Sequence, residues 1–592
     1  MSHARAKEPI AATSRRLGDY STDRRVLTLS GAAVVIGLLG ALAARGLDLL
    51  IALITNLAFG GRFSTERLAP ASYHPGPWSV LIPIVGGLII GAMARWGSPK
   101  IRGHGIPEAL EAILIGRSRL DAKVAVLKPV SSAISIGTGG PFGAEGPIIM
   151  TGGAAGSLFA QLFHLSSAER KTLLVAGAAA GMSAIFAAPI ASVLLAVELL
   201  LFEWKPRSFI PVVVASAVSS VARVPLFGAG GPIFPVPQHA GVSAAALLFA
   251  VALGIAGGLA SGALTWAVYF FEDVFERLPI HWAWWPAIGG LCIGIGGLVN
   301  PLVLGVGYGT IHDLLLGKLT GAPAGSLAVT KGVVWAAALG SGTSGGVLAP
   351  LLMMGASLGS LASGLLPHGD PGLWAVVGMA AIMGGTMRSP LTATFFAAEL
   401  TQDWNLLPAL LVSCVAAYAL TVLLLRRSIL TEKIARHGHH IFREYSVDPF
   451  EIHRVGEVMD RSIGAVPTAM SVRELSRLIA GSDPVLARRQ GTPIVDSAGK
   501  LVGIVTRSDL MRSLEKDPGG DTAVLDAGTR NPVVAFEDEL IADAVSRMLD
   551  RDIGRLPVVD SADPSRLIGY LGRSGVLAAR QRLHDEENRR ER

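Results

Sequence analysis

The chain has 592 residues, of which 51% are hydrophobic, 16% are charged and 71 are glycine. Glycine makes up about 12% of the chain against a usual ~7%, an excess that suits close helix packing in lipid. The net charge of +6 does not call for a nucleic-acid partner, because basic residues beside membrane segments account for it. Only Cys292 and Cys414 are present, both in apolar segments, which argues against a disulfide framework and fits a reducing cytoplasm.

The charged residues divide the chain into two parts. Residues 27–425 carry long apolar stretches, whereas residues 426–592 have the composition of a soluble protein. The N-terminal segment lacks a short apolar core followed by a small-residue cleavage site, so a cleaved signal is not expected. Basic residues flank the membrane part at Arg15, Arg16, Arg24, Arg25, Arg426, Arg427, Lys433 and Arg436. By the positive-inside tendency both ends are cytoplasmic, which predicts an even number of crossings of a bacterial-type inner or plasma membrane.

The membrane part is expected to be all-α, with many broken helices. Its apolar segments lie near 27–59, 77–97, 123–137, 147–164, 170–203, 208–223, 241–272, 284–306, 326–340, 347–366, 371–386 and 390–425. Many are shorter than the ~20 residues that span a bilayer, or are interrupted by glycine and proline. Non-helical backbone survives at membrane depth only where protein or a water-filled cavity covers it, so these breaks mark a permeation site.

The segment from Gly139 to Pro147, GGPFGAEGP, places one carboxylate, Glu145, at the mouth of an apolar helix. A helix that starts at Pro147 presents unpaired backbone N–H groups and the positive end of its dipole, which suits an anion. Glu145 therefore lies where that anion would bind.

An internal repeat relates the two halves of the membrane part. Residues 137–157, GTGGPFGAEGPIIMTGGAAGS, parallel residues 340–360, GSGTSGGVLAPLLMMGASLGS, at an offset of 203. Residues 187–199 parallel residues 388–400 in the same order, at an offset of 201. Two related halves of inverted topology bring corresponding broken helices together at the substrate site. Helix N-termini at Pro147 and near Pro350 then face one point, which favours an anion.

Three motifs make the chain resemble the CLC family of chloride channels and chloride/proton antiporters. They are GHGIP at 103–107, GAEGP at 143–147 and GVLAP at 346–350. The resemblance implies a homodimer with one pore per subunit, in a membrane domain at 27–430 after a cytoplasmic segment at 1–26. It also implies that Glu145 is the external gating glutamate and that backbone N–H groups of Val347 and Leu348 bind the central anion. The expected anion-binding set is completed by His104, Gly105, Ile106, Gly146 and Leu430.

Three positions depart from the family's usual residues. His104 stands where a serine often holds the central anion, and Leu430 stands where an inner-gate tyrosine is usual. Leu199 aligns with a second, proton-relaying glutamate of many antiporters, although some family antiporters lack it. These departures slightly favour passive chloride conduction. The alternative is chloride/proton exchange by an atypical proton path.

Gating follows from the position of Glu145. An ionised carboxylate at membrane depth costs ~2.5–3.5 kcal/mol, so it should pair with donors or become protonated. Glu145 can occupy the site as a tethered anion, until a permeant anion or protonation displaces it. The other interpretation is a carboxylate that only complements a helix dipole.

His104, Glu198 and Glu399 each leave two interpretations open. His104 either donates to the anion or is a structural histidine turned away from the pore. Glu198 and Glu399 each lie nine residues after a proline in the repeat, which favours a shared packing or helix-anchoring role. The alternative for Glu198 is a proton path.

The cluster His437-Gly-His-His440, in the linker at 431–455, lacks cysteine or carboxylate ligands at convincing spacing, so no metal is expected there.

The soluble part contains a second repeat. GTPIVD at 491–496 with LVGIVTRSDL at 501–510 recurs as RLPVVD at 555–560 with LIGYLGRSG at 567–575. Each copy predicts strand, turn, strand and helix. The repeat resembles a tandem pair of α/β CBS domains, at 456–515 and 523–580, before a charged tail at 581–592.

The resemblance to CBS pairs implies one candidate nucleotide site. Thr506 and Asp509 match the residues that contact adenine-nucleotide phosphate and ribose, whereas Gly572 and Gly575 replace them in the second copy. The alternative is a pair that only dimerises and braces the membrane domain, with Asp509 at a helix N-terminus. No cofactor is otherwise required.

Other classes of membrane protein fit less well. A CBS-regulated magnesium or other cation transporter should place several acidic residues along its membrane helices, but this membrane part is poor in aspartate. An intramembrane zinc protease needs His-Glu-x-x-His, which the sequence lacks. We therefore expect an anion transporter and not an enzyme.

Overall fold

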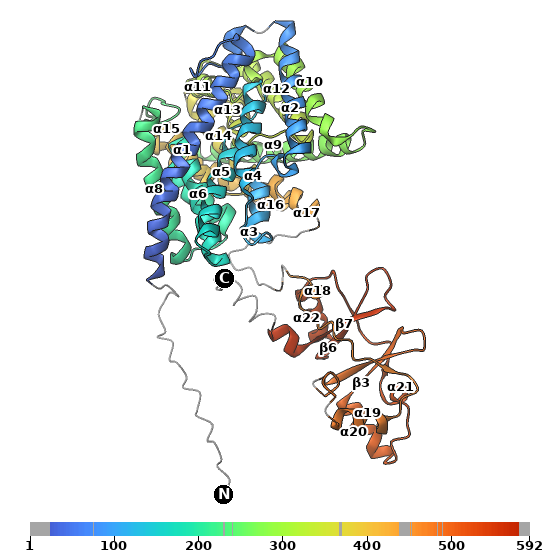
Figure 1. Ribbon diagram of the computed structural model, residues 1–592. Helices are drawn as coiled ribbons and strands as arrows, with labels where there is room; N and C mark the ends of the chain where they lie inside the picture. Colours follow the sequence, from blue (N-terminus) through green and yellow to red (C-terminus); the bar gives the residue numbers. More distant parts are fainter. Residues whose placement is uncertain are drawn as a thin grey trace. The chain divides into compact units, whose positions relative to one another are not determined.

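The computed structural model divides the chain into two compact units, before and after residue 440, and each is described by itself (Figure 1). The described residues are 24–74, 76–228, 231–239, 241–365, 370–436, 438, 450, 453–481, 483–487 and 489–578. The first 23 residues, the C-terminal tail from 579 and three histidines of the linker cluster thus lie outside the described part.

The first unit is helical throughout its regular structure. Its α-helices are α1 (Arg25–Gly60), α2 (Leu81–Trp96), α3 (Ile106–Leu114), α4 (Ala122–Gly137), α5 (Glu145–Leu162), α6 (Ser167–Phe186), α7 (Pro189–Leu195), α8 (Pro206–Phe227), α9 (Ala244–Glu276), α10 (Trp285–Val299), α11 (Tyr308–Leu315), α12 (Gly321–Gly340), α13 (Leu348–Ala362), α14 (Pro371–Met387), α15 (Pro390–Thr401), α16 (Leu407–Leu424) and α17 (Ile429–Arg436). Within the described residues, seven helical stretches are long and apolar enough to cross a membrane. Others, such as α7 and α13, are too short to do so alone, as the interrupted apolar segments predict.

The two halves pack alike. Helix α5 packs on α6, and α1 on α8, just as α13 packs on α14 and α9 on α16. Glycine allows the backbones to meet at matching points, because a Cβ on Gly152 of α5 would collide with the carbonyl of Gly177 of α6. Gly355 of α13 and Gly378 of α14 meet in the same way. The duplicated helical architecture predicted from sequence is therefore present.

Glu198 and Glu399 join the halves. Glu198 lies in a π-helical turn, Ala196–Leu201, and its carboxylate accepts the Thr392 N–H at the start of α15, at 2.8 Å. Glu399 of α15 accepts the Ala191 N–H at the start of α7, also at 2.8 Å. Each glutamate thus caps a helix of the opposite half, where the dipole favours a carboxylate. The expected helix-anchoring role is confirmed for both.

The second unit contains two similar small sheets. Their strands are β1 (Val466–Pro467), β2 (Gly491–Val495), β3 (Leu501–Thr506), β4 (Thr529–Arg530), β5 (Ala535–Phe536), β6 (Arg555–Val559) and β7 (Leu567–Gly572), and the helices are α18 (Val455–Val458), α19 (Val472–Ala480), α20 (Arg507–Lys516), α21 (Val524–Ala527) and α22 (Ile541–Asp550). In each sheet a two-residue strand pairs parallel to the first strand of an antiparallel hairpin.

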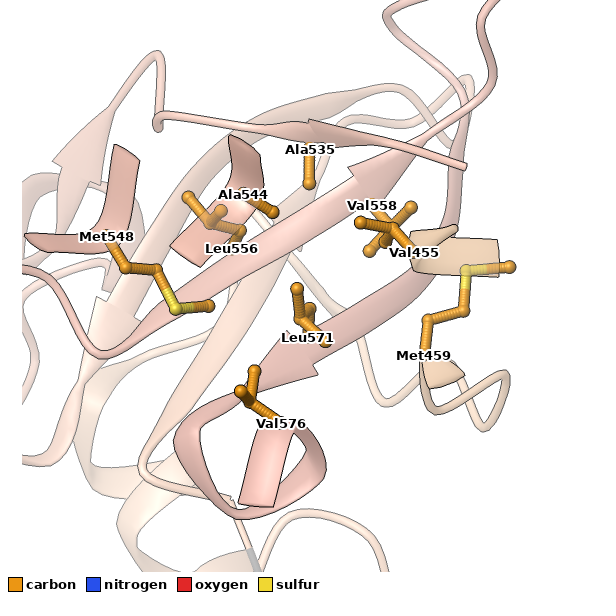
Figure 2. Packing of buried hydrophobic residues seen from close by; sticks show 9 residues of the cluster. All are labelled: Val455, Met459, Ala535, Ala544, Met548, Leu556, Val558, Leu571 and Val576. Carbon is orange, nitrogen blue, oxygen red and sulfur yellow. The ribbon is translucent and has the colours of Figure 1, made fainter. Parts of the chain in front are cut away.

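Each sheet of the second unit covers its own apolar core. The core of the second sheet includes Leu556 and Val558 of β6, Leu571 of β7 and Met548 of α22 (Figure 2). The first sheet has a separate core that includes Ile494 and Val505. The predicted order of strand, turn, strand and helix is therefore confirmed in the first copy by β2, β3 and α20.

Candidate anion site

The three glycine-rich motifs meet at one place in the first unit. Gly143 and Gly346 pair as an antiparallel bridge, and Gly103 pairs with Ser344. A Cβ on Gly146 would collide with the carbonyl oxygen of His104, so only glycine permits this approach. The residues that carry the family resemblance, distant in sequence, thus surround one buried point.

The Glu145 carboxylate occupies the N-terminus of a helix from the other half. Glu145 is 0% exposed, and its Oε1 accepts a hydrogen bond from the Leu348 N–H. The Ala349 N–H also faces this carboxylate. Leu348 opens α13, so the carboxylate lies at the positive end of that helix dipole. A side-chain carboxylate here stands where a free anion would be bound by the same N–H groups.

This arrangement corrects one detail of the sequence analysis. Helix α5 begins at Glu145 and not at Pro147, which is its third residue. Glu145 therefore does not lie in front of its own helix. Its side chain reaches the start of α13, and Ala349 joins the N–H donors that the motifs predict.

His104 is buried beside this point. It is 4% exposed, and its Nδ1 has no hydrogen-bond partner among the described residues. The neighbouring Gly105 N–H is already engaged, since it donates to Glu108 Oε2 at 2.7 Å. Ile106 begins α3 and is buried. Among the buried side-chain polar atoms of this loop, the imidazole Nδ1 lacks a hydrogen-bond partner within the described residues.

Leu430 is buried in α17, which is fixed by residues that the sequence analysis did not single out. Lys433 Nζ lies 2.5 Å from Glu108 Oε1 and so joins α17 to α3. The Tyr269 hydroxyl of α9 donates to the Ile429 carbonyl at 2.5 Å. The phenol of Tyr269 therefore fixes the start of α17. No sequence pattern identifies either contact in advance.

Leu199 lines a small cavity that also touches Leu348. The cavity of about 10 Å³ has roughly the volume that one water molecule needs. Its lining is mostly apolar: Leu195, Leu199, Leu348, Met383, Met387, Ser389, Thr392, Ala393 and Phe396. Thr392 Oγ1 lies 2.6 Å from Glu198 Oε2. The cavity is therefore lined both by Leu348, whose N–H binds Glu145, and by Thr392, which binds Glu198.

The candidate nucleotide residues of the second unit contact each other. Thr506 precedes α20, and its hydroxyl donates to Asp509 Oδ2 at 2.6 Å while accepting the Asp509 N–H at 3.2 Å. This reciprocal cap is a helix-start arrangement. Gly572 ends β7 and offers no hydroxyl at the corresponding place.

Over the described residues, no group of three or more histidine, cysteine, aspartate or glutamate side chains is arranged to hold a metal ion.

Comparisons with known proteins agree with this geometry. The family model of the voltage gated chloride channel matches residues 86–422, and the CBS domain model matches residues 455–516 and 524–582. The voltage-gated ClC-type chloride channel ClcB of Salmonella typhimurium is 31% identical over 415 residues, which are 68% of this chain and 98% of that protein.

Solved structures share the fold. A slow cyanobacterial Cl-/H+ antiporter superposes with a TM-score of 0.61 at 23% identity, over 70% of this chain and 99% of that one. A CLC-type fluoride/proton antiporter superposes with a TM-score of 0.58 at 20% identity, over 68% and 97% of the two chains. The chain is thus an integral, multi-pass membrane protein with a C-terminal CBS pair, and it belongs to the CLC family of voltage-gated chloride channels and anion transporters.

Proposed function

We propose that this chain exchanges chloride, or a similar monovalent anion, for protons, through one pore in each subunit of a homodimer. The observation that carries the proposal is the Glu145 carboxylate at the start of α13, bound by backbone N–H groups that suit an anion. Such a carboxylate competes with the permeant anion, and it loses its charge by taking up a proton. One group can therefore serve both the gate and proton transfer.

The sequence alone slightly favours passive conduction, whereas the solved structures support exchange better. Two of the structural neighbours are described as proton antiporters, one for chloride and one for fluoride. One observation favours passive conduction as a second candidate function. The cavity beside Leu199 is mostly apolar and offers a water molecule few polar partners, so it is a poor proton path.

Reconstitution separates these two functions. Full-length protein in liposomes is given a chloride gradient while the external pH is recorded. Chloride-driven uphill proton movement supports exchange, whereas chloride flux that moves no protons supports passive conduction. The Glu145→Gln variant should transport anions with a much weaker pH dependence. A variant whose pH dependence matches the parent protein contradicts the role of Glu145 in either function.

We assign the second unit a regulatory role, with an adenine nucleotide bound beside Thr506 and Asp509. CBS domains as a class take such ligands, and this copy retains both polar groups. Their present mutual hydrogen bonds equally suit a purely structural helix cap. Titration of the protein with labelled ATP or AMP, to millimolar concentration, distinguishes a nucleotide sensor from a structural brace.

A further inference from the structure

A carboxylate that leaves the start of α13 needs a second place to bind. In a buried setting, an ionised carboxylate without hydrogen-bond donors is strongly disfavoured. Glu145 Oε2 already lacks a hydrogen-bond partner among the described residues. When an anion takes the Leu348 N–H, the whole carboxylate depends on another donor.

Tyr308 offers a buried donor on a segment that is bonded to the loop before the gate. It is the first residue of α11, and its hydroxyl is buried without a hydrogen-bond partner in the described part of the chain. The charges that act on this hydroxyl through space are those of Glu145, Asp48 and Arg67. Asp48 and Arg67 form an ion pair of 2.6 Å toward the C-terminal end of α1. Tyr308 therefore lies within electrostatic reach of both the gate and this pair.

The backbone before Tyr308 is held firmly against the segment that carries the gate. The Gly305 N–H donates to the carbonyl of Gly139, in the loop that precedes Glu145, at 3.0 Å. Lys331 Nζ donates to the Gly305 carbonyl at 2.9 Å. The Tyr308 ring packs edge-to-face on Phe234, with ring centroids 5.8 Å apart. A donor fixed in this way is ready to receive the carboxylate without reorganisation.

We propose that the Tyr308 hydroxyl receives the Glu145 carboxylate when an anion displaces it from α13, so that Tyr308 is a positioning residue of the gate. The inference rests on the proposed function, because it takes Glu145 as the gate. Tyr308 stabilises the displaced position of the glutamate and thereby favours the conducting state.

The Tyr308→Phe variant tests this inference, because it keeps the ring on Phe234 and removes only the donor. In liposomes near neutral pH, we expect anion efflux to fall about tenfold, the effect of losing one hydrogen bond to a charged acceptor. At acidic pH the loss should be smaller, because a protonated Glu145 leaves α13 more readily. The matched control is Tyr418→Phe, which removes a hydroxyl from a half-buried position of α16.

The double variant Glu145→Ala with Tyr308→Phe decides how Tyr308 acts, because alanine removes every acceptor at this position. We expect its efflux to equal that of Glu145→Ala alone, which also shows that the protein folds. An equal loss in both backgrounds overturns the inference, since Tyr308 then acts on the pore without the gate. Unchanged efflux in the single Tyr308 variant overturns it as well. A different result contradicts the proposed function: anion transport by the single Glu145→Gln variant that keeps the pH dependence of the parent protein.

Discussion

Lys128 and Lys331 make the same hydrogen bonds in the two halves of the membrane domain. Lys128 Nζ donates to the carbonyl of Gly103 at 2.7 Å, and Lys331 Nζ to that of Gly305 at 2.9 Å. Each makes a second bond of 2.8 Å to the carbonyl two residues earlier. Both lysines are 0% exposed, and their spacing of 203 residues equals the offset of the anion motifs. Each half thus uses a buried lysine to fix the loop before a short helix.

Replacing either lysine by methionine should destabilise the membrane domain. The change leaves two buried carbonyl groups without their donor, and one such group costs ~1–3 kcal/mol. We expect Lys128→Met and Lys331→Met to lower the midpoint of thermal unfolding in detergent to a similar degree. Lys318→Met is the control, since Lys318 is exposed and pairs with Asp313. If the Lys128→Met and Lys331→Met proteins melt at the same temperature as the control, the two lysines do not stabilise these loops.

Much of this site follows from sequence, because glycine patterns and repeat offsets report close backbone approach. The meeting of the motifs at 143–147 and 346–350 is predicted in this way, whereas that of the motif at 103–107 is implied by the family resemblance. The start of α5 is wrong by two residues, since a proline is favoured at the first helical position but is tolerated throughout the first turn. The helix end that Glu145 occupies depends on how the halves meet, which no local pattern encodes. The paired lysines carry a usable signal, their shared offset of 203.

The reciprocal caps of Glu198 and Glu399 provide a test of the proton path with a built-in control. Each glutamate accepts two backbone N–H bonds from a helix of the other half. We expect Glu198→Gln and Glu399→Gln to lose similar stability, about 1–2 kcal/mol, because a charged acceptor at a helix start becomes neutral. Proton-coupling ratios in liposomes should be unchanged in both. Selective loss of coupling in Glu198→Gln would instead place Glu198 on the proton path.

His104 should contribute to anion affinity through its imidazole. Its buried Nδ1 has no partner within the described residues, and the adjacent Gly105 amide is bound to Glu108. We expect His104→Ala to weaken chloride binding about tenfold in calorimetric titration, the loss of one hydrogen bond to a charged acceptor. His281→Ala, at an exposed histidine, is the control. Equal chloride affinity in the parent and His104→Ala proteins would leave His104 a structural residue.

The CBS pair should bind nucleotide at one copy only, because Thr506 and Asp509 have glycine counterparts at 572 and 575. Thr506→Ala should cost about 1 kcal/mol of stability, since it removes the cap of α20. Thr506→Ser keeps this cap and also keeps a hydroxyl for phosphate. We therefore expect labelled AMP to bind the parent and Thr506→Ser proteins alike, and Thr506→Ala at least tenfold more weakly. Because both variants retain Asp509, the difference reports the hydroxyl, both as the cap of α20 and as a donor to phosphate. Binding that is equally strong in all three proteins would place the nucleotide elsewhere, and its absence from all three would leave the pair a structural brace.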